Sequence, residues 1–234
     1  MPIDTLLTGL QHWPMFIVAG LALNLTPGTD MALIARSSAS QGLKAGVAAA
    51  LGVSAGCGVH IALAAAGLTA LLASSTLAFA LLRWAGAAYL VWLGWGLIRG
   101  AGAAAVLANA VAGVAAGTAP RSRVRHCSRV RHCFAQGFLT NALNPKVAMF
   151  FLAFVPQFIT ANAPSKPLAF IVLGTVFVVN STVVNLGLAW AVARLSRRLG
   201  RHPGWASAGR WLNGGVGALF VALGLRLAWG NGTH

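Results

Sequence analysis

The sequence predicts an all-α, polytopic membrane protein with six transmembrane helices. Of its 234 residues, 58% are hydrophobic and only 8% are charged, whereas about 25% of the residues of a soluble domain carry charge. The apolar residues come in runs of about twenty, which is long enough to cross a hydrocarbon core roughly 30 Å thick. Lipid is therefore the expected solvent for most of the helical surface.

Hydropathy windows place the spans one after another along the chain. The stretch 101–118 has the length of a span but contains mainly Ala, Gly and Val, so a linker is expected there. The chain then divides into a first three-helix unit at 1–99, a basic cytoplasmic linker at 100–133 and a second three-helix unit at 134–234. The six expected spans lie near residues 11–34, 46–73, 77–98, 134–160, 167–193 and 211–229.

The distribution of Lys and Arg predicts the orientation, because cytoplasmic loops retain cations. If both termini lie outside, in the periplasm, the outer loops and span ends hold only Arg83, Lys166 and Arg226, while most other cations lie inside. The net charge of +15 is spread over loops and not along one polar face, so nucleic-acid binding is not expected. Membrane lipid is the expected surrounding partner.

The first and fourth spans resemble each other. Segment 16–27 reads Phe-x3-Gly-x3-Asn-Leu-Thr-Pro, and segment 134–145 reads Phe-x2-Gly-x3-Asn-x2-Asn-Pro. Each proline sits within an apolar run. A duplicated unit with an odd number of spans must be inverted in its second copy, so the sequence predicts two inverted three-helix repeats with proline-broken first helices.

The two prolines interrupt the backbone hydrogen bonding of their helices. Pro27 and Pro145 lack an amide hydrogen and clash with the carbonyl four residues earlier. In a membrane the freed backbone groups need protein, water or a ligand as partners. Neighbouring side chains allow a simple patched kink, whereas paired breaks in two halves favour a binding site. The residues beside the prolines that enter this candidate site are Asn24, Thr26, Gly28, Asn141 and Asn144.

Two charged residues accompany the breaks. Asp30 is one of only two acids in the chain, and Lys146 directly follows Pro145. A charge within a span costs at least about 2.5 kcal/mol, so each should face the bundle interior with a partner. One alternative is an Asp30–Lys146 ion pair that docks the halves. The other is a zwitterion site, with Asp30 and carbonyl ends taking an ammonium, and helix N-termini with Lys146 taking a carboxylate.

These motifs resemble those of a known family. Residues 24–30, Asn-Leu-Thr-Pro-Gly-Thr-Asp, are similar to the Asn-x-Thr-Pro-Gly-Pro-Asp signature of the lysine and homoserine/threonine exporter family, often called LysE/RhtB. Residues 137–146 and 150–158 resemble its second signature, and the likeness covers most of 10–99 and 134–160. The family pattern has proline where this chain has Thr29, so a less sharp first break is expected.

The resemblance implies a secondary exporter of amino acids in a bacterial inner membrane, driven by an ion gradient and not by ATP. We expect a small amino acid or amino-acid derivative as substrate, proton antiport, no cofactor or metal, and possible homo-oligomers. An enzyme is not expected, although an intramembrane enzyme with a Cys57–His60 dyad and a passive channel for small polar solutes are the alternatives.

Three further polar residues join the candidate site. His60 shares a helix face with Gly52 and Gly56, whose small size permits close approach of another helix. His60 is either a hydrogen-bonded packing residue or a proton relay. Ser181 and Asn185 form a polar stripe in the fifth span, which is explained by interhelical hydrogen bonds or by substrate lining.

The central linker contains a perfect hexapeptide duplication. The sequence Ser-Arg-Val-Arg-His-Cys occurs at 122–127 and again at 128–133. The His-Cys steps lack the spacing of two to four residues within each ligand pair that structural zinc sites show. We interpret the duplication as a solvated basic loop held at the anionic inner leaflet.

Overall fold

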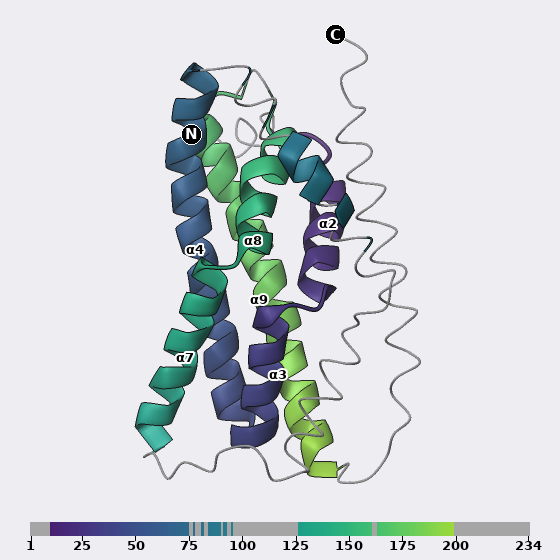
Figure 1. Cartoon of the computed structure of the whole chain (residues 1–234), viewed down its shortest axis with the longest axis vertical. Coiled ribbons are helices and arrows are strands. Elements are labelled where there is room, and N and C mark those ends of the chain that lie inside the picture. The colour runs from purple at the N-terminus through teal and green to yellow at the C-terminus, as the bar shows by residue number, and fades with distance from the viewer. Residues whose placement is uncertain are drawn as a thin grey trace.

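The computed structural model describes residues 10–74, 126–160 and 163–198, together with residues 77, 81, 84–89, 91, 92 and 95. The named elements are helices, of which α4 (Leu43–Ser74) and α9 (Lys166–Arg198) are the longest (Figure 1). The described residues between 77 and 95 are helical as well. The expected span 211–229, the rest of span 77–98 and the stretch 101–118 lie outside the described residues.

Both predicted proline breaks are confirmed. The first broken span, which contains Pro27, bends by 56° between its two helices. The second broken span, which contains Pro145, bends by 46°. Gly42, with a φ of 87°, then turns the chain from the first span into α4. The first span consists of α2 (Trp13–Leu25) and α3 (Thr29–Gln41). The second consists of α7 (His126–Ala142), α8 (Pro145–Met149), the π-helix η1 (Phe150–Phe154) and the 3₁₀-helix η2 (Val155–Phe158).

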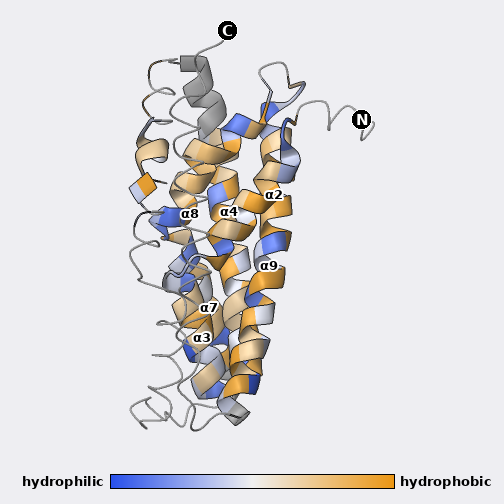
Figure 2. Ribbon diagram, turned by 90° about the vertical axis from the view of Figure 1, so that its right-hand side faces the viewer, coloured by the Kyte–Doolittle hydropathy of each residue, from blue (hydrophilic) through white to orange (hydrophobic). Residues whose placement is uncertain are grey.

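The described part of the chain contains helices that could span a membrane. Two helices, α4 and α9, are long and apolar enough to cross a membrane, and up to four spans result if each bent pair is one span. Hydrophobic residues make up most of the coloured ribbon, and hydrophilic residues lie towards both ends of the bundle and near α8 (Figure 2). The two broken spans run in opposite directions (Figure 1), as inverted units require, while the complete six-helix repeat stays a prediction.

The start of α7 corrects one expectation. The second hexapeptide copy, 128–133, is expected in a loop, but it is helical because α7 begins at His126. Within this copy Arg131 and His132 are exposed while Cys133 is buried. A helix satisfies the backbone while one face solvates the cations, so the basic sequence does not require a loop.

Close contact between α4 and α7 depends on glycine. A Cβ atom at Gly52 would collide with the carbonyl oxygen of Phe134, and one at Gly137 would collide with that of Ala49. At Gly56 the same atom would lie 2.7 Å from the carbonyl oxygen of Phe138. This confirms the prediction that the small residues of the expected span 46–73, which is α4, admit a neighbouring helix.

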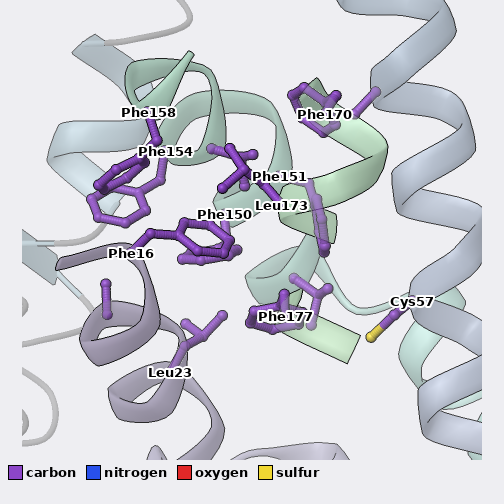
Figure 3. Close-up of a cluster of buried hydrophobic side chains, with 14 of the residues drawn as sticks. Phe16, Leu23, Cys57, Phe150, Phe151, Phe154, Phe158, Phe170, Leu173 and Phe177 are labelled. Atoms are coloured by element: carbon purple, nitrogen blue, oxygen red, sulfur yellow. The ribbon is translucent and has the colours of Figure 1, made fainter. Parts of the chain in front are cut away.

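Aromatic side chains from α2, η1, η2 and α9 pack into one buried hydrophobic cluster (Figure 3). Phe150 lies with its ring centroid 5.9 Å from that of Phe16 in α2 and 4.9 Å from that of Phe177 in α9. Phe158 packs edge-on to Phe16 at 5.3 Å. These contacts hold α2, η1, η2 and α9 together around the breaks.

The irregular end of the second broken span, at η1 and η2, has a local cause. Pro156 has no amide to donate to the carbonyl of Leu152, so a regular α-helix cannot continue through this position. The chain widens into η1 and then tightens into η2. The side chain of Gln157 donates to the Ala153 carbonyl at 2.7 Å, which satisfies one of the remaining acceptors.

Candidate functional site

At the first break, a side chain from the second half satisfies the freed backbone. The amide that Pro27 lacks would have bonded to the carbonyl of Leu23. That carbonyl instead accepts from the Thr26 amide at 3.2 Å and from Lys146 Nζ at 3.3 Å. Lys146 Nζ also donates to the carbonyl of Thr26 at 3.2 Å. The Lys146 ammonium therefore caps the carboxyl end of α2, where a positive charge is favourable.

The second break has a matching arrangement. The carbonyl of Asn141, which the missing Pro145 amide would have engaged, accepts from the Asn144 amide and from His60 Nε2, each at 2.8 Å. Because a carbonyl oxygen only accepts, Nε2 of His60 carries the proton. The Asn144 side chain caps α8 by accepting from the Lys146 amide at 3.0 Å.

Asp30 connects the first half to the second break. Its Oδ2 accepts from Nδ2 of Asn141 at 2.8 Å and from Nδ2 of Asn144 at 3.1 Å. Asn144 also reaches the hydroxyl of Thr29 at 3.4 Å. Asp30 lies in the first turn of α3, where a negative charge is favourable. The charge that follows each proline is thus bonded to the opposite break.

This crossed arrangement replaces the ion pair considered from the sequence. Within the described part of the chain, Lys146 donates to carbonyl oxygens and Asp30 accepts from amides, and no salt bridge joins the two side chains. Gly28 makes room for the arrangement, since a Cβ atom there would lie 3.2 Å from Lys146 Nζ. Lys146 and Asp30 therefore hold the two halves together through hydrogen bonds to neutral groups and not through an ion pair.

A small cavity lies between the breaks, and three polar atoms of residues lining it lack partners. Nδ2 of Asn24, Oδ1 of Asp30 and Oδ1 of Asn141 are buried without a hydrogen-bond partner. Unpartnered buried polar groups are costly, so their gathering at one place is typical of a ligand site. The cavity residues come from both halves and are Leu23, Asn24, Thr26, Asp30, Met31, Asn141, Lys146, Val147, Phe177, Ser181 and Asn185.

The cavity is closed in this conformation. Its volume for the centre of a water molecule is about 20 Å³, which is room for a water molecule. An amino acid does not fit without separation of the surrounding helices.

The polar stripe on α9 lies at the same cavity. Asn185 Nδ2 donates to the Ser181 hydroxyl at 3.1 Å, and both residues line the cavity. The neighbouring Thr182 hydroxyl bonds to that of Ser54 on α4 at 2.7 Å. Asn180 reaches the carbonyl of Ile17 on α2 at 3.3 Å. Interhelical hydrogen bonds thus explain Asn180 and Thr182, whereas Ser181 and Asn185 face the cavity.

The structure brings all predicted site residues into one region. Pro27 and Pro145 form the breaks, and His60 and Asn144 bond to groups at the cavity wall. His60 is buried and stacks on Phe151, which fits the packing role allowed by its sequence. Its Nε2 is directed at the Asn141 carbonyl, so this nitrogen is not available to Cys57 as the base of the dyad considered above.

Sequence reasoning missed the apolar wall of the cavity. Met31 directly follows Asp30, Val147 directly follows Lys146, and Phe177 lies four residues before Ser181 on α9. Four-residue spacing on a helix would have placed Phe177 on the face of Ser181. The signal was present but was hidden among many other apolar residues.

The chain is similar to known proteins over most of its length. The family model described as "LysE type translocator" matches residues 21–231. The chain is 33% identical over 218 residues to the homoserine/homoserine lactone efflux protein of Salmonella typhimurium strain LT2, covering 93% of this chain and 96% of that protein.

Two other relatives cover a similar extent. A leucine efflux protein of Enterobacter sp. strain 638 is 29% identical over 220 residues, with 94% of this chain and 96% of that protein covered. An uncharacterized membrane protein of Vibrio cholerae is 30% identical over 219 residues, with 94% and 97% covered. No solved structure matches the chain.

Proposed function

Because this chain belongs to the LysE type translocator family, we propose that it exports a small amino acid or amino-acid derivative from the bacterial cytoplasm by proton antiport. The family is one of amino-acid efflux translocators, with relatives named for homoserine and leucine efflux. We place the chain in the inner membrane with both termini in the periplasm, because this orientation puts most of its cations inside.

The unpartnered Oδ1 of Asp30 carries the proposal. This oxygen and Oδ1 of Asn141 are acceptors without a conventional donor, and Nδ2 of Asn24 is a donor without an acceptor. A primary ammonium would supply donors to the two oxygens, and a carboxylate, carbonyl or hydroxyl oxygen would accept from Asn24. Homoserine, its lactone and leucine all carry an amino group and an oxygen acceptor on the neighbouring carbon.

The same carboxylate offers a route to coupling. A proton on Asp30 removes its negative charge, so protonation and ammonium binding compete for one side chain. Exchange of one for the other is the elementary requirement of antiport. Each charge crossing 100 mV supplies ~2.3 kcal/mol, which supports a gradient of roughly fifty-fold when 1.4 kcal/mol is tenfold.

Transport also requires the closed cavity to open. The 56° and 46° bends lie next to the cavity, so rotation at either break would separate its walls. Opening would stretch the bonds from Lys146 to α2 and from Asp30 to the second break. These crossed bonds would then stabilise the closed state, and an ammonium at Oδ1 of Asp30 would weaken the bonds to Oδ2 by neutralising part of the carboxylate charge.

Substitution of Asp30 tests the proposal. In everted vesicles carrying a pH gradient, Asp30→Asn should reduce uptake of the exported amino acid about 10- to 100-fold, since bonds to charged groups are worth about 1.5–3 kcal/mol. The matched control is Asp4→Asn, the same chemical change at the chain's other acid, which should transport normally. Undiminished pH-driven transport by Asp30→Asn at equal expression would contradict the proposal.

A further inference from the structure

A second concave site lies at the basic end of the bundle, away from the proline breaks. It is a groove of about 1130 Å³ between the first turns of α4 and the first half of α7, larger than the roughly 300–1,000 Å³ of usual ligand pockets. Figure 1 shows α7 diverging from α4 towards this end. The glycine contacts hold the two helices together further along, so the divergence leaves the groove open.

The groove combines an apolar floor with a basic rim. Leu51 and Phe134 are 44% and 42% exposed, although both are large hydrophobic residues. Lys44, Arg131 and His132 line the same groove and are exposed. Among the residues that the structure describes, Asp30 is the one acid, and it does not line the groove. The remaining lining residues are Leu43, Val47, Ala48, Val130 and Ala135.

We propose that this groove binds an anionic phospholipid, with the phosphate at Lys44 and Arg131 and an acyl chain along Leu51 and Phe134. The charge at the rim favours an anion, and the apolar floor favours a hydrocarbon tail. A free phosphate lacks the tail, and a zwitterionic lipid brings an ammonium that the cationic rim repels. Basic pockets between transmembrane helices at the cytoplasmic side bind anionic head groups by this combination. A second copy of this chain, also strongly cationic, would be repelled from the rim.

The groove also gives the helical part of the hexapeptide duplication a role. Arg131 and His132 belong to its second copy, and α7 presents them on the exposed side while Cys133 points inward. A lipid bound here would bridge the start of α4 and the start of α7, two segments that the sequence separates by the basic linker. The inference concerns a site other than the transport cavity and does not depend on which solute is exported.

Native mass spectrometry of the purified full-length protein tests the inference. With phosphatidylglycerol, the double variant Lys44→Gln/Arg131→Gln should bind about 25-fold more weakly than the unchanged protein, since each cation near the surface contributes about fivefold. The matched control Arg36→Gln/Arg194→Gln removes two exposed cations of α3 and α9 outside the groove, and should bind as the unchanged protein does. Phosphatidylcholine with the same tails should bind weakly to all three proteins.

Two further arms distinguish the groove from other sources of binding. Phe134→Ala should weaken phosphatidylglycerol binding while leaving the rim charge intact, and inorganic phosphate at the same concentration should not raise the melting temperature. Equal lipid binding by the Lys44/Arg131 variant and its control would place the lipid elsewhere, for example at the linker arginines. That result, equal binding of phosphatidylcholine, or full stabilisation by phosphate alone would each overturn the inference.

Discussion

At the scale of single residues, the site depends on side chains that take the place of missing backbone amides. Lys146 supplies a donor to the Leu23 carbonyl and His60 supplies one to the Asn141 carbonyl. Both carbonyls lost their regular partner to a proline. The presence of these two side chains is therefore tied to Pro27 and Pro145. Neither residue lies in the same helical segment as the proline that left its carbonyl partner without a regular donor.

His60 offers a direct test of this replacement. His60→Leu should lower the free energy of unfolding by about 1–3 kcal/mol, because it removes a buried donor. His60→Gln retains a donor of similar reach and should keep both most of the stability and pH-driven transport. Thermal unfolding in detergent and transport in vesicles are the two measurements.

The transport measurement separates the two roles considered for His60. Stable His60→Gln protein that no longer couples transport to the pH gradient would show that the imidazole relays protons. Equal destabilisation by Leu and Gln would show instead that the donor to the Asn141 carbonyl does not matter.

The asparagines could be predicted as site residues, but their partners could not. The sequence places Asn141 and Asn144 beside a proline, which is sufficient to expect hydrogen bonds to freed backbone. Whether Asp30 would bond to Lys146 or to these amides depends on the rotation and depth of two spans that are separated by more than a hundred residues. Hydropathy and spacing do not fix those variables.

At the scale of helices, the glycines of α4 determine how closely α7 packs. Gly52→Val should lower the free energy of unfolding by about 1–3 kcal/mol or more, since its Cβ collides with the rigid backbone of α7. Gly58→Val is the matched control on the same helix, because a Cβ there meets nothing within 4 Å. Thermal unfolding of both variants should separate them clearly, and equal melting temperatures would contradict the described α4–α7 contact.

Helix type followed from the sequence more reliably than helix limits. The expected spans 46–73 and 167–193 correspond to α4 and α9, because long apolar runs identify such helices directly. The start of α7 at His126 did not follow, because hydropathy detects where lipid contact begins and not where the helix begins. The π-helix at Phe150–Phe154 was also missed, although Pro156 was a visible cause.

At the scale of the whole molecule, the orientation in the membrane can be measured. Ser40, exposed near the end of α3, should lie inside, and Ser165, just before α9, should lie outside. In a Cys127→Ser background, Ser165→Cys should react with a membrane-impermeant maleimide in intact cells, while Ser40→Cys should react only in everted vesicles. The reverse pattern would contradict the orientation derived from the cations.

The two broken spans run in opposite directions, which is the arrangement that the proposed inverted repeat requires. α2 with α3 and α7 with α8 run antiparallel (Figure 1), and each half sends one charged side chain to the break of the other. A shared cavity between such halves can be opened from either end by a similar motion. The proposed mechanism therefore centres on Asp30, which accepts hydrogen bonds from the second break and at which we propose that proton and substrate compete.

Proton release on substrate binding tests this centre most directly. In weakly buffered detergent solution, tested over a series of pH values, addition of an amino acid such as homoserine or leucine should acidify the medium for the unchanged protein and for Asp4→Asn. Asp30→Asn should release no proton. Binding of the amino acid without acidification at any pH, or equal acidification by the Asp30→Asn variant, would contradict the account.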